Sequence, residues 1–297
     1  MEQRPACNVD SKTDPGTADI RSVTAAMPAA DAFLCLASSI IEEIGLYVQS
    51  LDSAADPETL HKLRVSLRRL RSLWWAYQPL LARKNAMRQR ALFKSLADMA
   101  GRTRNWDVLH DLLETSRHAS LELTSLLHSV RQCRADALSD SLREIRCAGV
   151  VNTLGQSLSG ASEQLARRDA GRQFGDFAGL RVAVARKRLR KKVRWSLRHR
   201  HADYAGLHAV RIAGKKLRYL TELFAPALEV RDKGVIKRLI RMQDELGRLN
   251  DLAVSQSLLR QHAEQLANSE EVEKVIRWLR TRKRHAMRAV MRMLWKE

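Results

Sequence analysis

The sequence predicts an all-α protein. Only 13 glycines and 6 prolines interrupt its 297 residues. Apolar residues recur at spacings of three and four, and no stretch alternates apolar and polar residues as a half-buried strand would. Hydrophobic residues make up 45% of the chain, enough to bury one large core or two of moderate size. We expect two pseudo-symmetric four-helix bundles that arise from an internal duplication.

The first half is expected to hold four helices behind a tail. Residues 1–28 contain three prolines among scattered polar residues, which predicts a mobile tail. Asp56 suits an N-cap, Pro57 suits the first position of the helix that follows, and Pro79 should end that helix. The expected helices span about 30–51, 57–78, 85–102 and 105–147, the last long enough to be broken.

The second half is expected to repeat this pattern. Five glycines between residues 155 and 179 predict the boundary between the halves. Asp203 and Pro226 stand where Asp56 and Pro79 do in the first half. The expected helices span about 179–201, 204–225, 232–247 and 250–295. The folded domain is then 29–297, with a first half at 29–160, a linker at about 155–179 and a second half at 179–297.

One segment of the chain occurs twice. Residues 61–71, HKLRVSLRRLR, return 147 positions later as residues 208–218, HAVRIAGKKLR. Further on, GRTRNWDV at 101–108 matches GRLNDLAV at 247–254 at an offset of 146, so one gap aligns long parts of the halves. A period of this length indicates a duplicated domain and is far longer than a solenoid repeat.

Both copies of the segment place a basic stripe beside an apolar one. On a helix, His61, Arg64, Arg68 and Arg71 fall within an arc of about 80°. The second copy repeats the arc, and its members are His208, Arg211, Lys215 and Arg218. A helix with such a stripe is suited to hold an anion, and the duplication predicts two helices that face one ligand.

The charge of the chain favours a polyanionic partner. Lys and Arg total 53 against 33 Asp and Glu, for a net charge of +20 and a pI near 10.5. Residues 59–97 and 181–200 each contain ten Lys or Arg and no acid, so pairs four residues apart cannot neutralise them. We expect a cytoplasmic protein that does not enter the membrane, because no long apolar run or secretory signal occurs.

Little in the sequence supports catalysis or a cofactor. It contains no glycine-rich phosphate loop, nucleophile elbow or paired-carboxylate metal motif, so we expect no catalytic residue, no metal ligand and no cofactor. The four cysteines lie far apart and are interpreted as reduced, small apolar residues. The six tryptophans follow apolar helical spacings and are expected in the core. Asn105, Asp107, Asn250 and Asp251 are interpreted as helix caps or as partners that orient a basic residue.

Over about residues 30–295 the chain resembles the conserved histidine α-helical domain (CHAD) family. The resemblance is carried by His61-x-x-Arg64-Val65-x-x-Arg68-Arg69-Leu70-Arg71, by His208-x-x-Arg211-Ile212-x-x-Lys215-Lys216-Leu217-Arg218-Tyr219, and by Leu246-Gly247-x-x-Asn250-Asp251. It implies a duplicated pair of four-helix bundles that binds inorganic polyphosphate in a central basic groove, without catalysis. Targeting to polyphosphate granules would follow from such binding. General nucleic-acid binding is the alternative, and an enzyme acting on polyphosphate is a third hypothesis.

Polyphosphate offers many similar charged groups, so recognition should rest on many Arg and Lys contacts. Arg69 and Lys216 lie off the main arc, and the sequence favours ligand contact and interhelical pairing equally for them. Arg186 and Arg190 are selected from the basic stretch 181–194 because they share a helix face. Protonation of the histidines should strengthen binding as the pH falls from about 8 to 6. The expected polyphosphate-binding residues are His61, Arg64, Arg68, Arg69, Arg71, His208, Arg211, Lys215, Lys216, Arg218, Arg186 and Arg190.

Overall fold

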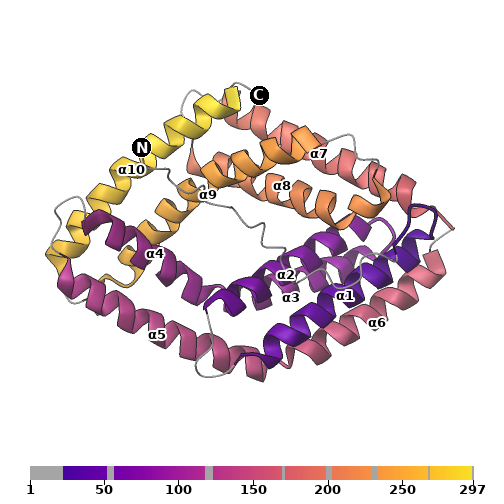
Figure 1. Ribbon diagram of the computed structural model, residues 1–297, viewed down its shortest axis with the longest axis horizontal. Helices are drawn as coiled ribbons and strands as arrows, with labels where there is room; N and C mark the ends of the chain where they lie inside the picture. The colour runs from indigo at the N-terminus through magenta and orange to yellow at the C-terminus, as the bar shows by residue number, and fades with distance from the viewer. Residues whose placement is uncertain are drawn as a thin grey trace, which may run out of the picture.

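The computed structural model describes residues 23–51, 57–117, 123–168, 171–198, 203–228, 233–266 and 268–295. Within these residues the chain forms ten α-helices and two short 3-10 turns, without a β-strand (Figure 1). The predicted all-α class is confirmed. The helices are α1 (Ala29–Gln49), α2 (Pro57–Tyr77), α3 (Arg83–Met99), α4 (Arg102–Arg117), α5 (Thr124–Cys147), α6 (Val150–Arg168), α7 (Phe174–Arg198), α8 (Tyr204–Leu223), α9 (Lys233–Gln261) and α10 (Ser269–Trp295).

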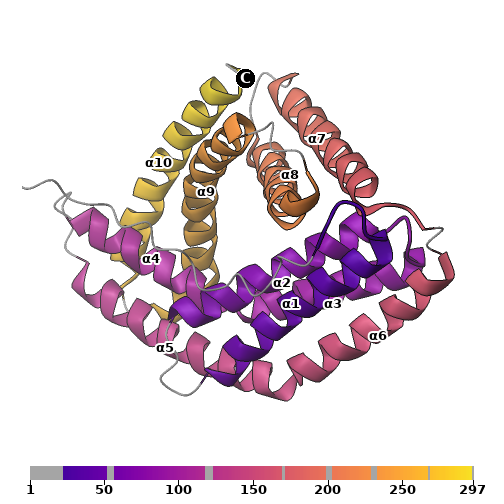
Figure 2. The same cartoon turned by 45° about the vertical axis from the view of Figure 1, so that its right-hand side comes forward.

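The two helices that carry the duplicated segment lie next to each other. In Figure 1 the long helices α5, α6, α7 and α10 form an outer frame, and α2 and α8 lie inside it. Helix α2 packs against α1, α3 and α8, while α8 packs against α7 and α9. The view in Figure 2 shows α8 and α9 rising from the layer of helices that contains α2. The duplicated basic stripes are therefore brought together at the centre of the molecule.

The predicted signals set the ends of these two helices. Helix α2 begins at Pro57 and stops at Tyr77, two residues before Pro79. The side chain of Asp203 caps α8 by accepting a hydrogen bond from the backbone N–H of Gly206 at 2.7 Å. Helix α8 ends at Leu223, ahead of Pro226. Asp56 lies outside the described residues.

One expected break is narrower than predicted and another is absent, because apolar stripes continue through several of the glycines. Helix α6 runs to Arg168 and α7 begins at Phe174, so most of the expected linker at 155–179 is helical. Buried Leu154, Ala161 and Leu165 hold α6 to the core. Helix α9 continues through Gly247 and Asn250, and the chain leaves it only after Gln261. Asn250 therefore cannot cap a helix there.

Part of the expected tail is ordered. Residues 1–22 lie outside the described residues, but residues 23–28 are fixed against the start of α7. Val23 is buried, and Pro28 forms an isolated β-bridge with Gln173. The backbone N–H of Phe174 donates to the carbonyl of Met27 at 2.8 Å. This strap ties the beginning of α1 to the beginning of α7.

Two hydrophobic cores stabilise the fold, and both combine helices from the two halves of the sequence. In the larger core the ring of Tyr77 lies 4.8 Å from that of Phe33 in α1 and 4.4 Å from that of Phe177 in α7. The smaller core joins α4 and α5 to α9 and α10 around Trp106, Leu109 and Leu259. Neither half buries its apolar surface without the other.

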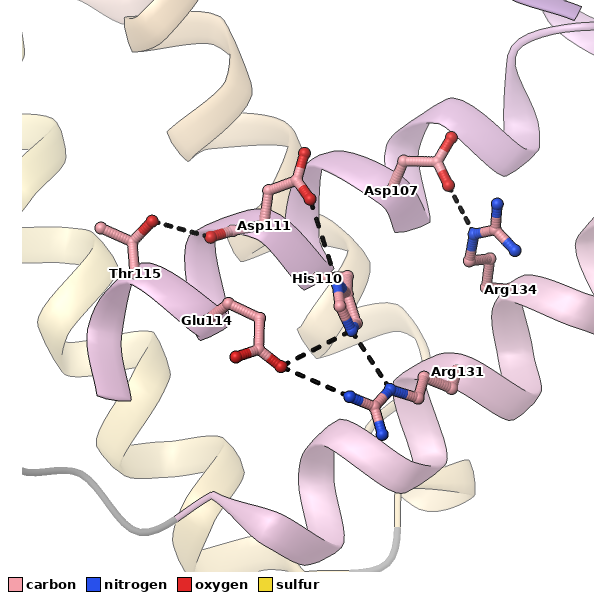
Figure 3. A network of polar contacts seen from close by, with 7 residues as sticks. All are labelled: Asp107, His110, Asp111, Glu114, Thr115, Arg131 and Arg134. Carbon is pink, nitrogen blue, oxygen red and sulfur yellow. Dashed lines mark hydrogen bonds and ion pairs between the residues drawn. The ribbon is translucent and has the colours of Figure 1, made fainter. Parts of the chain in front are cut away.

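Helices α4 and α5 neutralise each other's charges. Figure 3 shows the side chains involved, in which Arg134 Nε pairs with Asp107 at 2.5 Å. Arg131 donates to His110 Nε2 at 3.2 Å and to Glu114 at 3.4 Å. Asp107 thus lies inside α4 and pairs with Arg134 of α5, the second of its two expected roles, and does not cap a helix. The carboxylates shown in Figure 3 therefore pair within α4 and α5 and not with the basic stripes of α2 and α8.

The tryptophans and cysteines depart in part from expectation. Trp74, Trp75 and Trp106 are buried, as predicted, and Trp278 is half-buried. Trp195 is 46% exposed and Trp295 is 67% exposed, so the expected core position is wrong for both. The described cysteines are free, and Cys35 and Cys147 are exposed rather than packed. Among the described residues, no helix has the length and apolar character that crossing a membrane requires.

Trp74→Ala tests the larger core. The Trp74 ring lies 4.7 Å from that of Phe33 and 5.0 Å from that of Phe93. Deleting it leaves a cavity among α1, α2 and α3, so the free energy of unfolding in urea should fall by about 3–5 kcal/mol. Trp295→Ala is the control, and as an exposed site it should change stability by no more than about 0.5 kcal/mol. Equal effects of the two substitutions would contradict this assignment of the core.

Candidate anion-binding site

Helices α2 and α8 face each other across a cavity of about 390 Å³ that is lined by an excess of cations. Helices α3 and α9 complete its walls, together with Asn105 of α4. Asp98 is the one carboxylate among the lining residues, and it already accepts a hydrogen bond from Lys94 at 2.7 Å. The lining Lys and Arg residues are Arg64, Arg68, Arg71, Arg90, Lys94, Arg211, Lys215 and Lys216.

Two larger hollows lack this charge imbalance. One of about 710 Å³ is lined by Asp136 and Asp140 with Arg102 as its only Lys or Arg among the lining residues. Another of about 780 Å³, between α4, α9 and α10, is lined by three carboxylates and three arginines. The central cavity is smaller, but it alone among these three concentrates one sign of charge.

Several guanidinium groups in the cavity have donors without a partner. The buried Nε atoms of Arg64, Arg71, Arg90 and Arg211 make no hydrogen bond to any described residue. Burying a charged donor without an acceptor is unfavourable. An anion that supplies oxygen atoms would satisfy these donors and offset the repulsion between the side chains.

Burial, aided by neighbouring like charges, lowers the pKa values of several basic residues in the cavity. Burial lowers the pKa of Lys215 to about 7, and the charges of Arg211, Arg68 and Arg64 act in the same direction. Burial also lowers the pKa of Lys216 to about 8, aided by Arg90, Arg188 and Arg71. The pKa of Arg64 falls to about 10 through burial and the charge of Arg68. A bound anion would favour the charged forms and raise these pKa values again.

Two glycines let the helices approach this closely. A Cβ atom at Gly101 would lie 2.7 Å from Cζ of Arg64, so the missing side chain leaves room for that guanidinium group. A Cβ atom at Gly214 in α8 would lie 2.3 Å from Nε2 of Gln243 in α9. Gly101 thus leaves room for Arg64, and Gly214 lets α8 pack closely against α9.

The two histidines of the duplicated segment occupy different environments. His208 lines the cavity, and its Nδ1 lies 3.5 Å from the hydroxyl of Tyr204, which donates to Asn250 at 3.3 Å. His61 does not line the cavity, although its pKa is lowered by burial and by the charges of Arg104, Arg64 and Lys215. Burial and the charge of Arg211 lower the pKa of His208.

The cavity brings together seven of the twelve residues that the sequence singled out, namely Arg64, Arg68, Arg71, His208, Arg211, Lys215 and Lys216. Besides His61, four do not line it. Arg69 pairs with Glu43 of α1 at 3.1 Å, whereas its counterpart Lys216 lines the cavity. Arg218 donates to Glu222 at 2.6 Å, one turn further along α8. That spacing of four residues is visible in the sequence and predicts the pair.

Arg186 and Arg190 share a face of α7, but not the face that contacts α8. Arg188 and Lys192 lie beside α8 residues, and Arg186 and Arg190 point to the opposite side at 100° per residue. Arg190 is exposed and Arg186 is half-buried. The sequence showed that Arg186 and Arg190 share a face of α7, but it did not show which face of α7 contacts α8.

Sequence reasoning missed the contribution of α3 and of two amides. Arg90 and Lys94 line the cavity and lie four residues apart in the stretch 59–97, which contains no acid. That lack of acids could have identified both as candidate ligands of an anion. Asn105 and Asn250 were expected as caps or as partners of a basic residue, and both lie within helices and line the cavity. Their amide groups can donate to an anion without adding charge.

Comparisons with known proteins agree with this architecture. The CHAD domain family model matches residues 41–260. The crystal structure of the CHAD domain from the plant Ricinus communis is similar, with a TM-score of 0.74 and 27% identity over 92% of this chain and 93% of that one. PptA from Streptomyces chartreusis shares the fold, with a TM-score of 0.63 and 15% identity over 91% of this chain and all of that one. No curated protein matches the sequence.

The lowered pKa values predict that anion binding depends on pH. Without a ligand, the pKa values of Lys215 and Lys216 are about 7 and about 8. Above these pH values the two amines must take up protons when an anion binds. The affinity for tripolyphosphate should therefore fall as the pH rises above 7, by up to about tenfold per pH unit for each proton taken up. Histidine protonation adds to affinity only in the more acidic range. Isotherms at matched ionic strength would measure both effects.

K215R/K216R is the control for this pH dependence. Arginine keeps its charge throughout the range, so the variant should bind with an affinity that is nearly flat above neutral pH. Identical pH profiles for the wild type and the variant would show that other groups take up the protons.

Gly101→Ala should weaken anion binding without unfolding the protein. The new methyl group would displace the Arg64 guanidinium, the flexible end of a side chain, so the main cost falls on the ligand site. It would also approach the carbonyl oxygen of Ala97 to 3.1 Å, which needs only a small shift. Gly247→Ala is the matched control, because it is the aligned position of the second half and its Cβ would meet no atom within 4 Å. We expect G101A to lower the affinity for tripolyphosphate several-fold, roughly 1 kcal/mol. Equal affinities of the two variants would contradict the role of Gly101.

Proposed function

Because this chain belongs to the CHAD domain family, we propose that it binds inorganic polyphosphate in the cavity between α2 and α8 and does not alter it chemically. One observation carries the proposal. Eight Lys and Arg side chains surround the cavity with a single, already paired carboxylate among its lining residues. Such a site is unfavourable when empty and becomes favourable when filled with negative charge.

The geometry suits a thin, flexible polyanion. The basic stripe of α2 rises about 15 Å from His61 to Arg71, and that of α8 follows it on the other side. Arginines can hold phosphate oxygens with two hydrogen bonds, and lysines add mobile point charges. Successive phosphate groups along one chain would then be gripped from both helices.

The lining favours polyphosphate over nucleic acid. Tyr219 is the one aromatic residue among the lining residues, and it is 8% exposed. Single-stranded nucleic acids are held largely by stacking on exposed aromatic rings, which this lining does not offer. A duplex is too wide for a cavity of about 390 Å³. General nucleic-acid binding is therefore the weaker alternative.

The same lining supports binding rather than catalysis. Its guanidinium, ammonium, imidazole and amide groups are suited to hold an anion, while Asp98 is paired with Lys94. The protein would then act by attaching itself, or a partner, to polyphosphate. We propose a cytoplasmic location at polyphosphate granules as the consequence of this affinity.

The quadruple variant R64A/R68A/R211A/K215A tests the proposal. It removes two cations from each side of the cavity, so the affinity for long-chain polyphosphate should fall by at least about 100-fold, or about 3 kcal/mol. The helical circular dichroism spectrum should persist, and the Tm should hold or rise because like charges have been removed. Titration calorimetry or fluorescence anisotropy at fixed salt would measure the affinity.

The matched control removes four exposed arginines elsewhere, in R143A/R146A/R167A/R168A on α5 and α6. This variant should retain most of the wild-type affinity at the same net charge. Equal losses of affinity in the two quadruple variants would show that binding depends on the net charge of the protein and not on the cavity. Displacement of bound polyphosphate by DNA or RNA at lower phosphate concentration than the reverse would favour nucleic acid. Metal-dependent release of phosphate from polyphosphate would indicate an enzyme.

A further inference from the structure

A second basic groove adjoins the cavity. Helices α7 and α8 line a hollow of about 420 Å³ whose lining includes Lys216. All charged residues among those that line it are cations, namely Arg188, Lys191, Lys192 and Lys216. Ile212 and Lys216 belong to the lining of both hollows, so the groove and the cavity meet at these two side chains.

The junction lies over the indole ring of Trp75. Lys216 Nζ lies 4.5 Å from the ring centroid, and the guanidinium carbons of Arg188 and Arg181 lie at 4.8 Å and 4.9 Å. The buried ring holds these cations in place through their attraction to its π face. Lys216 is close enough to Arg71 and Arg90 of the cavity, and to Arg188 of the groove, for all three charges to act on it. The positive potential is therefore continuous from one hollow to the other.

The groove forms a track of useful length. From Ala185 to Lys192 helix α7 rises about 10 Å. The small side chains of Ala185, Ala209 and Ala213 line it between the cations, and Lys191 and Lys192 are exposed. Rotatable ammonium groups at an open edge can follow successive phosphates without a fixed register.

We infer that a polyphosphate chain too long for the cavity leaves it over Trp75 and continues along the groove between α7 and α8, where Lys191 and Lys192 bind its extended part. This inference rests on the proposed function. The lining residues shared by the two hollows connect the cavity to the groove. The cations of the groove attract the phosphate groups of a polyphosphate that extends along it. No residue lining the groove is aromatic, so its chemistry fits a bare phosphate chain better than a nucleic acid with bases to stack.

The test compares chain lengths in the full-length protein. K191A/K192A should lower the affinity for long-chain polyphosphate roughly threefold to tenfold, the scale expected for two exposed ionic contacts. Its affinity for tripolyphosphate, which the cavity can hold alone, should equal that of the wild type. The matched control is K187A/R194A, which removes two exposed cations of α7 that line neither hollow and should leave both affinities near wild type.

Three results would overturn the groove assignment. The first is an equal loss of affinity in K191A/K192A and K187A/R194A. The second is that K191A/K192A loses as much affinity for short chains as for long ones. The third is that K191A/K192A loses more affinity for single-stranded DNA than for polyphosphate. The cavity variant R64A/R68A/R211A/K215A separates this failure from that of the proposed function. If it loses polyphosphate binding while K191A/K192A does not, only the groove assignment fails. If it retains binding, the proposed function itself fails.

Discussion

The structure depends on holding many like charges close together with few carboxylates to neutralise them. Eight Lys and Arg side chains line one cavity, and burial already lowers the pKa of Lys215 to about 7. Repulsion of this kind opposes folding. It is offset by apolar burial behind the basic stripes, where the Tyr77 ring joins α1 and α7 through Phe33 and Phe177. The free energy gained by burying the hydrophobic core thus offsets the repulsion between the cations of the cavity.

The two copies of the duplicated segment share a pattern but differ in what their side chains do. Arg69 turns to Glu43 of α1, while Lys216 at the equivalent position lies over Trp75 and lines the cavity. Arg71 lines the cavity, while its counterpart Arg218 pairs with Glu222. Position 75, the counterpart of Glu222, is a tryptophan, so Arg71 has no such partner one turn along. The neighbours of each helix decide which cations remain available to an anion.

The sequence predicted what a single helix determines and missed what depends on its neighbours. Pro57, Pro79 and Asp203 identified the ends of α2 and α8, and helical periodicity identified seven residues of the cavity. Arg90 was missed because only the packing of α3 beside α2 turns it toward the site. The break between α6 and α7 lies within the expected linker but is much shorter, because buried Leu154 and Leu165 outweigh the glycines between them. Arg186 and Arg190 share a face, as expected, but nothing in their spacing says which side of α7 meets α8.

The mixed composition of the two cores bears on whether half of this fold could exist alone. Helices α1 to α3 meet α7 in the larger core, and α4 and α5 meet α9 and α10 in the smaller one. A polypeptide ending before α7 would present both apolar surfaces to water. Covering them would need a second polypeptide in the place that α7 to α10 occupy here. Half of this fold would therefore have to associate with a partner, and the cavity between α2 and α8 would then form only at the contact between the two chains.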